Sequence, residues 1–167
     1  MSRGRRPIAM NAIPDRLSDV VFITTPPEVI AAMLDLAAVR PDDVLYDLGC
    51  GDGRIAIAAA ERFGARAVGV DINPQRVAEA KENARLAGVG EGVQFYQQDV
   101  FASDFSTATV VTLYLMPLHN LKLRSALQQL QPGARVVSLD FDMGDWPPER
   151  VVPVTADATL YLWTIGD

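Results

Sequence analysis

The sequence contains only one cysteine and one histidine among its 167 residues. Cys50 cannot support a disulfide framework or a multi-thiolate metal site, so we expect no bound metal. His119 follows a proline early in a predicted helix, a position that favours a surface residue over a general base. No apolar run approaches the roughly 18 residues that a transmembrane helix requires. These scarcities exclude secreted disulfide scaffolds, zinc-ribbon proteins and helical membrane proteins.

Basic residues are also few, with 15 Lys and Arg against 21 Asp and Glu and a formal net charge of −6. A sequence pI near 4.7 disfavours a protein that holds duplex nucleic acid through phosphate contacts. The one dense basic cluster, formed by Arg3, Arg5 and Arg6, lies in the first residues. We therefore expect a cytoplasmic monomer that binds neither a membrane nor duplex nucleic acid.

Short apolar strands alternate with helix-like segments along most of the chain. We interpret residues 1–19 as a flexible N-terminal arm and residues 20–167 as a single domain. The pattern predicts strands at 44–47, 67–71, 93–96, 108–115 and 134–141, and helices at 26–38, 54–63, 74–87 and 117–130. Strands that are apolar on both faces and alternate with helices are typical of an α/β fold, a parallel sheet covered on each side.

The last two predicted strands, 151–154 and 159–165, break this rhythm. Only four residues separate them, which is too short for the crossover that parallel strands need. They are therefore expected to form an antiparallel hairpin at the edge of the sheet. At the other end of the domain, Thr25, Pro26 and Glu28 match a capping box, with Thr25 as the N-cap of the first helix.

A glycine-rich stretch, residues 47–53 (DLGCGDG), joins the first strand to the second helix. Strand, glycine turn and helix in this order predict a nucleotide-type cofactor site, since glycine lets the backbone approach a ligand closely. The third glycine of a dinucleotide motif is replaced by Arg54. Asp47 and Asp52 also place acids beside the helix N-terminus, where a phosphate would otherwise bind. This loop therefore suits a cofactor without phosphate.

Three acids follow three successive strands: Asp47, Asp71 and Asp99. In an open α/β sheet, ligands bind beyond the carboxyl ends of the strands. S-adenosylmethionine fits such a crevice, because it carries a sulfonium and an ammonium but no phosphate. Asp71 is placed to accept both ribose hydroxyls, Asp99 to accept from the adenine amino group, and Asp47 to support the ammonium end. For any one of these acids alone, a helix or turn cap is the competing interpretation.

These motifs resemble those of the class I S-adenosylmethionine-dependent methyltransferases. The resemblance rests on residues 47–53, on Val68-Gly69-Val70-Asp71 and on Gln98-Asp99-Val100-Phe101. It implies a Rossmann-like three-layer sandwich with a seven-stranded, mostly parallel sheet and an antiparallel C-terminal strand, with the glycine loop at the methionine moiety. The predicted cofactor-binding residues are Thr25, Asp47, Gly49, Cys50, Gly51, Asp52, Gly53, Asp71, Ile72, Asp99, Val100, Phe101 and Tyr114.

A narrower resemblance is to small prokaryotic methyltransferases related to archaeal and mitochondrial protein-lysine methyltransferases and, distantly, to the Dot1 histone methyltransferases. It is carried by the segments 22–27, 47–57, 110–117 and 136–146. It implies that Thr25 contacts the methionine end of the cofactor and that Tyr161 lines a lysine channel. Where Dot1 enzymes have asparagines after the fourth strand, this chain has Tyr114 and Leu115.

The acceptor side of the site is predicted from the apolar, aromatic segment 114–117 (YLMP). It lacks the Asn/Asp-Pro-Pro-Tyr/Phe tetrad of nucleobase and glutamine methyltransferases, which disfavours a planar amino acceptor. Asp140 and Asp142 are candidates to relay a proton or orient an ammonium, and a solvated turn is the alternative. The candidate channel residues are Phe22, Tyr114, Trp146 and Tyr161, for which core packing is the alternative interpretation.

The sequence therefore predicts an S-adenosylmethionine-dependent N-methyltransferase that methylates lysine side chains of a protein partner by in-line transfer and releases S-adenosylhomocysteine. Tyr114, Tyr161 and Asp140 are the candidate catalytic residues. In-line transfer requires mainly the positioning of the nucleophile and the exclusion of water. Cys50 is interpreted as small filler beside the cofactor rather than as a nucleophile. A small-molecule methyltransferase and a cofactor-binding protein without transferase activity remain alternatives.

Overall fold

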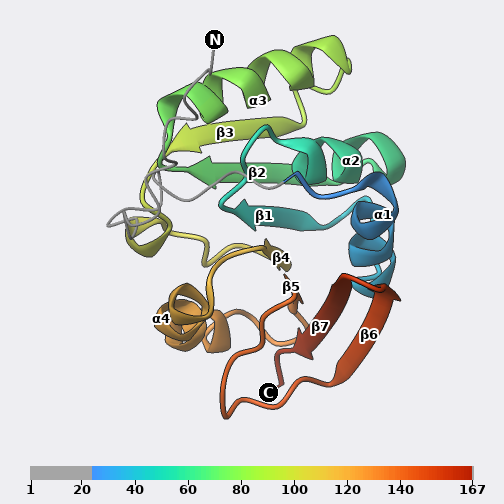
Figure 1. Cartoon of the computed structure of the whole chain (residues 1–167). Helices are drawn as coiled ribbons and strands as arrows, with labels where there is room; N and C mark the ends of the chain where they lie inside the picture. Colours follow the sequence, from blue (N-terminus) through green and yellow to red (C-terminus); the bar gives the residue numbers. More distant parts are fainter. Residues whose placement is uncertain (1–23, 167) are drawn as a thin grey trace, which may run out of the picture.

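The computed structural model describes residues 24–166 (Figure 1). The predicted arm over 1–19, the segment 20–23 and the channel candidate Phe22 therefore lie outside the described residues. No described helix is both long and apolar enough to cross a membrane. The elements are α1 (Pro27–Leu36), β1 (Val44–Leu48), α2 (Arg54–Phe63), β2 (Arg66–Asp71), α3 (Pro74–Leu86), β3 (Val93–Gln97), η2 (Val100–Ala102), β4 (Val110–Leu113), α4 (Pro117–Gln128), β5 (Arg135–Leu139), β6 (Arg150–Thr155) and β7 (Ala158–Thr164).

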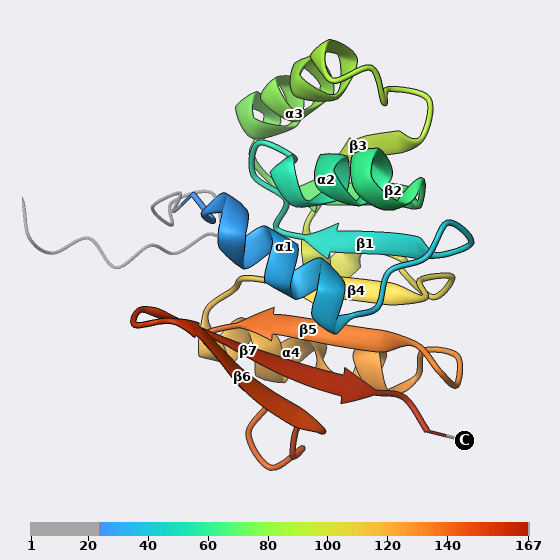
Figure 2. The same cartoon turned by 90° about the vertical axis from the view of Figure 1, so that its right-hand side faces the viewer.

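The seven strands of the described chain belong to one sheet with the order β3-β2-β1-β4-β5-β7-β6. The first five strands in the chain pair in parallel, whereas β7 pairs antiparallel with both β5 and β6. The α/β class, the seven-stranded sheet and the antiparallel C-terminal hairpin are thereby confirmed. Figure 2 shows α1 and α2 in front of the strands and α4 behind them, so helices cover both faces.

The buried core is divided by the sheet into two apolar clusters. One lies under α1, α2 and α3, and the other lies under α4 and the loop that follows β5. Every side chain of β4, the middle strand of the sheet, is buried. A strand buried on both faces has no polar alternation, which explains the continuous apolar run seen in the sequence.

The strand order reverses beside β1, which pairs with β2 on one side and β4 on the other. Figure 1 shows the arrowheads of β1, β2 and β3 pointing to the same side of the molecule. The loops that leave the parallel strands therefore meet at one edge of the sheet, which we call the carboxyl edge. Ligands of open α/β sheets bind at this switch point.

The start of α1 differs from the prediction. The N-cap is Pro26 rather than Thr25, the helix begins at Pro27, and no side chain caps it. The reason is local, because a residue before a proline is disfavoured in the helical region. Pro26 precedes Pro27 and accordingly has φ −62° and ψ 151°, which are extended values. The Asn73 cap of α3, in contrast, is present, since its side chain accepts hydrogen bonds from two backbone N–H groups of the first turn.

Phe95 on β3 packs against two glycines. It pairs with Gly69 across the sheet, and a Cβ added to Gly69 would lie 2.5 Å from the Phe95 ring. A Cβ added to Gly53, at the start of α2, would lie 2.6 Å from the same ring. The ring therefore connects the second strand to the end of the glycine loop. This packing against Phe95 fixes the position of the end of the glycine loop relative to β2 and β3.

Candidate cofactor and acceptor site

The glycine loop forms the centre of the carboxyl edge. Gly49, Gly51 and Gly53 have φ values of 81°, 55° and 83°, which residues other than glycine rarely adopt. The backbone N–H groups of Gly49 and Cys50 donate to the carbonyl oxygen of Val70 at 2.8 and 2.9 Å. The loop is thus attached to the end of β2. Gly49 is half-buried, whereas Cys50, Gly51 and Gly53 are buried, so the loop is packed tightly against the end of the sheet.

Asp71 at the end of β2 holds the same loop through its carboxylate. Oδ2 accepts from the N–H of Gly51 at 2.9 Å, and Oδ1 accepts from the N–H of Asn73 at 2.9 Å. An ionised carboxylate has about four acceptor positions, so two remain for a ligand. Ile72 follows directly and is half-buried. The hydrogen bond from the glycine loop therefore orients Asp71, the predicted ribose acceptor, and Asp71 in turn holds the loop in place.

Asp47 is buried beneath the loop, with 3% of its surface exposed. Its Oδ1 accepts from the hydroxyl of Thr112 at 2.8 Å. Burial raises the pKa of Asp47 to about 7, against the lowering effect of that hydrogen bond, and the charges of Asp71 and Asp52 raise it further. A carboxylate in this position is stabilised by a cationic ligand group.

The ion pair between Asp52 and Arg54 is a second anchor, which the sequence did not predict. Arg54 donates from Nε to Oδ1 of Asp52 at 3.0 Å and from Nη2 to Oδ2 at 2.6 Å. Burial by itself would raise the pKa of Asp52, but Arg54 outweighs it and the pKa is lowered. Arg54 also donates to the carbonyl oxygen of Thr25 at 3.2 Å. The bidentate pair thereby holds the segment before α1 against the loop and brings buried Thr25 to the site.

The predicted adenine side is built by the turn after β3. Asp99 accepts from the N–H of Phe101 at 2.9 Å through Oδ1, and Val100 is buried. The Phe101 ring lies 5.6 Å from the His119 ring, and Lys122 Nζ lies 4.2 Å from the Phe101 ring centre. Burial lowers the pKa of His119, and the charge of Lys122 lowers it further. His119 is therefore a neutral wall residue beside Phe101.

Cys50 is buried in the loop, with its Sγ 3.8 Å from the carbonyl oxygen of Gly51. Burial, followed by the charges of Asp47 and Asp71, raises the pKa of this thiol far above its ordinary range. Thiolates, not thiols, are nucleophilic. The environment of Cys50 thus favours the interpretation as filler.

The acceptor candidates separate onto two faces of the sheet. Tyr114 packs on the side of α1 and α2, where burial raises its pKa and the nearby charge of Asp140 raises it further. Tyr161 and Trp146 pack on the side of α4. The Tyr161 ring stacks on Trp163 at 6.2 Å between ring centres. The charge of Asp140 therefore acts on Tyr114, whereas Tyr161 packs on the other face of the sheet.

Asn120 on α4 is a buried polar residue that the sequence predictions missed. Its Nδ2 donates to Ser138 Oγ at 3.1 Å and to the carbonyl oxygens of Phe141 and Asp142, both at 3.3 Å. These bonds hold the loop after β5 that carries the candidate acids. A sequence signal existed, because Asn120 lies three residues before Leu123 and seven before Leu127 on the same buried helix face.

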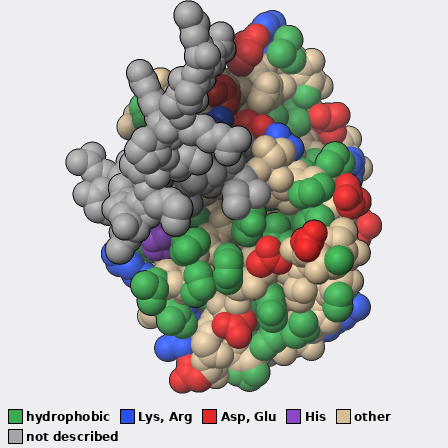
Figure 3. Space-filling model, in the orientation of Figure 1, with side chains coloured by type: hydrophobic (Ala, Val, Ile, Leu, Met, Phe, Trp, Pro, Cys, Tyr) green, Lys and Arg blue, Asp and Glu red, His purple; other side chains and the backbone are tan. Residues whose placement is uncertain are grey.

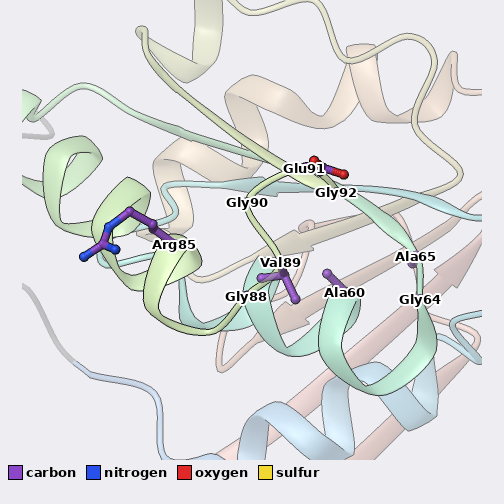
Figure 4. Close-up of a pocket in the computed structure, with 9 residues that line it drawn as sticks. All are labelled: Ala60, Gly64, Ala65, Arg85, Gly88, Val89, Gly90, Glu91 and Gly92. Atoms are coloured by element: carbon purple, nitrogen blue, oxygen red, sulfur yellow. The ribbon is translucent and has the colours of Figure 1, made fainter.

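A hollow at the opposite edge of the sheet is separate from this site. It lies between the ends of α2 and α3 and the glycine-rich turn before β3, as Figure 4 shows. The side chain of Arg85 points away from Val89 and Ala60 in that view. The hollow is lined mainly by small residues and backbone. It shares no residue with the carboxyl edge.

The family model described as the ANTKMT methyltransferase domain matches residues 47–150 of this chain. This span includes the glycine loop, Asp71, Asp99, Tyr114 and Asp140. The chain belongs to the ANTKMT methyltransferase family. It is an S-adenosylmethionine-dependent methyltransferase with the class I fold, as the sequence motifs predicted.

Two curated relatives of this methyltransferase are named as lysine methyltransferases. A protein-lysine N-methyltransferase of Saccharolobus islandicus is 42% identical over 89% of this chain and 95% of its own length. The adenine nucleotide translocase lysine N-methyltransferase of Mus musculus is 32% identical. That match spans 90% of this chain and 64% of the mouse enzyme, so the chain covers less than two thirds of that relative.

A solved relative shows the product bound to the same fold. The structure of an RNA methyltransferase from Salinibacter ruber in complex with S-adenosyl-L-homocysteine is 54% identical, with a TM-score of 0.84. The match covers 87% of this chain and 95% of that chain. The cofactor of the present enzyme is accordingly S-adenosylmethionine.

The residues of the carboxyl edge fit this cofactor. Asp47 accepts one hydrogen bond from a hydroxyl, and burial and the neighbouring acids raise its pKa. An ammonium group of the cofactor would stabilise its ionised form. Among residues 24–166, no group of three or more His, Cys, Asp or Glu side chains is placed to hold a metal ion. The loop also packs closely at Gly49, since an added Cβ would lie 2.8 Å from Leu115. The carboxyl edge therefore offers carboxylates and loop backbone, which complement the cationic groups and the hydroxyls of the cofactor.

Proposed function

We propose that this enzyme methylates the amino group of lysine side chains in a protein partner. The observation that carries the proposal is the likeness to the Saccharolobus protein-lysine N-methyltransferase, which spans 95% of that protein. Tyr114 and Asp140, an aromatic wall with an acid beside it at the carboxyl edge, support it, because such a pair suits a lysine ammonium.

The proposed cofactor contacts follow from the carboxyl edge. Asp71 binds the ribose hydroxyls with its two free acceptor positions, and Asp99 accepts from the adenine amino group. Asp47 faces the ammonium of the methionine end, with Thr25 and the N–H groups of the glycine loop on either side. Val100, Phe101 and Ile72 form the apolar border of the adenine, while Gly49, Cys50, Gly51, Asp52 and Gly53 shape the loop.

The cofactor supplies a methyl group on a sulfonium, and the protein has to present a neutral amine to it in line. A free lysine has a pKa of about 10.4, so its proton must be lost before attack. Asp140 is proposed to bind and orient the incoming ammonium, whose proton is lost to solvent before attack. Its Oδ1 already accepts from Thr159 N–H at 3.0 Å, which fixes the carboxylate. Tyr114 stays a protonated phenol and forms an apolar wall that excludes water.

RNA is the second candidate acceptor, because the Salinibacter relative is named as an RNA methyltransferase and is 54% identical. Against it stands the charge of the chain, which is −6 overall. The carboxyl edge also carries the acids Asp140 and Asp142, which repel a phosphate backbone. A small-molecule acceptor is the third candidate.

The deciding experiment incubates the purified full chain with methyl-labelled S-adenosylmethionine and a cell extract. Aliquots are then treated with protease or ribonuclease, and protein hydrolysates are analysed by mass spectrometry. Label in methylated lysine supports the proposal. Label that ribonuclease releases, or label only in extractable small molecules, assigns the other acceptors.

Two variants make this assay specific to the enzyme. Asp71→Ala is expected to lower the label strongly at a limiting concentration of the cofactor, because it removes the proposed ribose acceptor. Asp35→Ala changes an exposed acid in the last turn of α1 and should retain full labelling. Equal labelling by both variants would show that a contaminating methyltransferase is being measured.

A further inference from the structure

The first turns of α4 present exposed apolar side chains. Met116, Leu118 and Leu121 have 49%, 77% and 42% of their surface exposed, and we call them the α4 apolar surface. Leu118 and Leu121 lie one helical turn apart and share a face. Figure 3 shows hydrophobic side chains gathered over the position of α4. Elsewhere in the described chain, the large exposed apolar residues are single ones on α3, β3 and β6, namely Leu86, Tyr96 and Val151. Scattered single residues of that kind need no explanation, whereas a cluster does.

This surface is continuous with the acceptor side of the site. Met116 is the N-cap of α4, and α4 begins at the carboxyl edge because it follows the parallel strand β4. Two residues earlier is Tyr114, and Leu115 between them lies against Gly49 of the cofactor loop. Three consecutive residues thus form the acceptor wall (Tyr114), a contact with the cofactor loop (Leu115) and the start of the apolar surface (Met116).

Negative charge borders the surface on the side of the loop after β5. An added Cβ at Gly144 would lie 2.9 Å from Leu121, so this loop flanks the helix directly. Asp142 of the loop is exposed, and Asp140, two residues earlier, is close enough for its charge to act on Tyr114. Of the nearby cations of α4, Lys122 lies over the Phe101 ring, and Arg124 pairs with Asp145 of this same loop, which offsets one of its acids.

We propose that the α4 apolar surface docks the apolar residues that flank the acceptor lysine in the substrate protein. The occupant is a stretch of protein in which leucine-like side chains stand next to a lysine, and Asp140 and Asp142 attract its ammonium. The charge complementarity and the continuity with Tyr114 select this occupant, because an apolar surface with an acidic border repels a phosphate chain. The inference rests on the proposed lysine methylation and adds the class of sequence that is recognised.

The test compares two synthetic peptides of equal length, each with one lysine, flanked in one peptide by leucines and in the other by serines. Initial rates and fluorescence anisotropy in the presence of S-adenosylhomocysteine are measured with the full chain. The leucine peptide should have the lower KM and Kd. The double variant Leu118→Gln, Leu121→Gln should raise both about tenfold for the leucine peptide, which corresponds to about 1.4 kcal/mol. Its affinity for S-adenosylhomocysteine and its constants for the serine peptide should stay unchanged.

Leu86→Gln is the matched control, because Leu86 is 69% exposed at the end of α3. An equal effect of Leu86→Gln, or equal constants for the two peptides, overturns the docking surface. A change from dimer to monomer in the double variant assigns the surface to a second copy and also overturns it. Faster turnover of both peptides by the double variant would show that the surface does not dock substrate, with the same consequence.

Failure of the docking surface and failure of the proposed function give different results. If proteins of the extract are methylated on lysine but the leucine peptide neither binds nor reacts, the docking surface is wrong and the function stands. If no protein of the extract is methylated on lysine, the proposed function fails and the docking surface fails with it.

Discussion

The hydroxyl of Thr112 on β4 donates to the buried carboxylate of Asp47 on β1 at 2.8 Å, and both side chains are excluded from solvent. The two residues are opposite each other in the β1–β4 register. This bond stabilises the ionised form of Asp47, yet burial dominates and keeps the pKa at about 7. The ionisation of one acid beneath the cofactor loop therefore lies within the working pH range.

Cofactor affinity should depend on pH through Asp47. The folded pKa of about 7 exceeds the ordinary 3.8, so the stabilisation from protonated Asp47 is present at low pH and lost as pH rises towards 7. The ammonium of S-adenosylhomocysteine requires the ionised form. Its affinity, measured by calorimetry, should rise about tenfold from pH 6 to pH 8, and Thr112→Val should move the midpoint upward.

Asp47→Asn is expected to remove this pH dependence and to raise the melting temperature of the cofactor-free enzyme at pH 8. His119→Gln is the control, because His119 is the one histidine of the sequence and lies beside Phe101. A slope that persists in Asp47→Asn and vanishes in His119→Gln would assign the titration to the histidine.

Asp71→Ala should weaken S-adenosylhomocysteine binding by about 1.5–3 kcal/mol, the cost of hydrogen bonds to a charged group. The variant also loses the bonds to Gly51 and Asn73 N–H, so its melting temperature should fall. Calorimetry at constant pH measures the affinity, with Asp35→Ala as the surface control. Near-normal affinity in a folded Asp71→Ala protein would contradict the proposal that Asp71 binds the ribose.

Gly69→Ala should destabilise the fold by about 1–3 kcal/mol through overpacking. The added Cβ would lie 2.5 Å from the Phe95 ring and 2.8 Å from Cys50 Cβ. Gly90→Ala is the matched control, since nothing lies within 4 Å of its added Cβ. Urea unfolding of the two variants measures the difference, and equal stabilities would show that Phe95 moves aside freely.

The ion pair between Arg135 and Asp43 should contribute strongly to stability at the edge opposite the carboxyl edge, where the parallel strands begin. Arg135 Nη2 lies 2.6 Å from Asp43 Oδ2 with 14% and 2% of the side chains exposed, and Arg135 Nε donates to Ala37 O at 2.8 Å. Asp43→Ala leaves this guanidinium buried without its carboxylate, at a cost of about 3–5 kcal/mol in urea unfolding.

The neighbouring acid Asp42 gives the comparison for Asp43. Its pair with Arg40 is 3.6 Å long and mostly exposed, so Asp42→Ala should change stability by less than about 1 kcal/mol. Burial would raise the pKa of Asp43, but Arg135 and Thr109 outweigh it and lower the pKa. The stabilisation from Asp43 is therefore present above its ordinary pKa of 3.8 and lost as pH falls through the lower folded value. Equal effects of the two alanine variants would contradict this.

Tyr114→Phe and Tyr161→Phe locate the acceptor channel. Tyr114 lies beside Asp140, whereas Tyr161 stacks on Trp163 across the sheet. We expect Tyr114→Phe to lower kcat for lysine methylation several-fold, because it removes the phenol group from the proposed acceptor site. Tyr161→Phe should leave kcat within about twofold, because Tyr161 packs on the other face of the sheet. Both should keep normal S-adenosylhomocysteine affinity. The reverse result would place the channel on the α4 face.

The local parts of the fold could be read from the sequence. The strands and the C-terminal hairpin were predicted because apolar patterns and the length of a connection act within a few residues. The Thr25 cap was wrong for an equally local reason, the effect of Pro27 on Pro26, which the capping pattern alone does not include.

The sequence alone determined the order of strands and helices, the class I motifs and the three acids that follow the strands. Only the tertiary structure decided which groups meet. Alternation along β7 shows that Tyr161 and Trp163 share a face, but the pairing of Tyr161 with Ser138 decides which face. The anchor from Arg54 to Thr25 spans 29 residues, and the bonds from Asn120 reach the loop after β5. Such contacts depend on how whole elements pack, because no local propensity encodes the partner of a side chain far away in the chain.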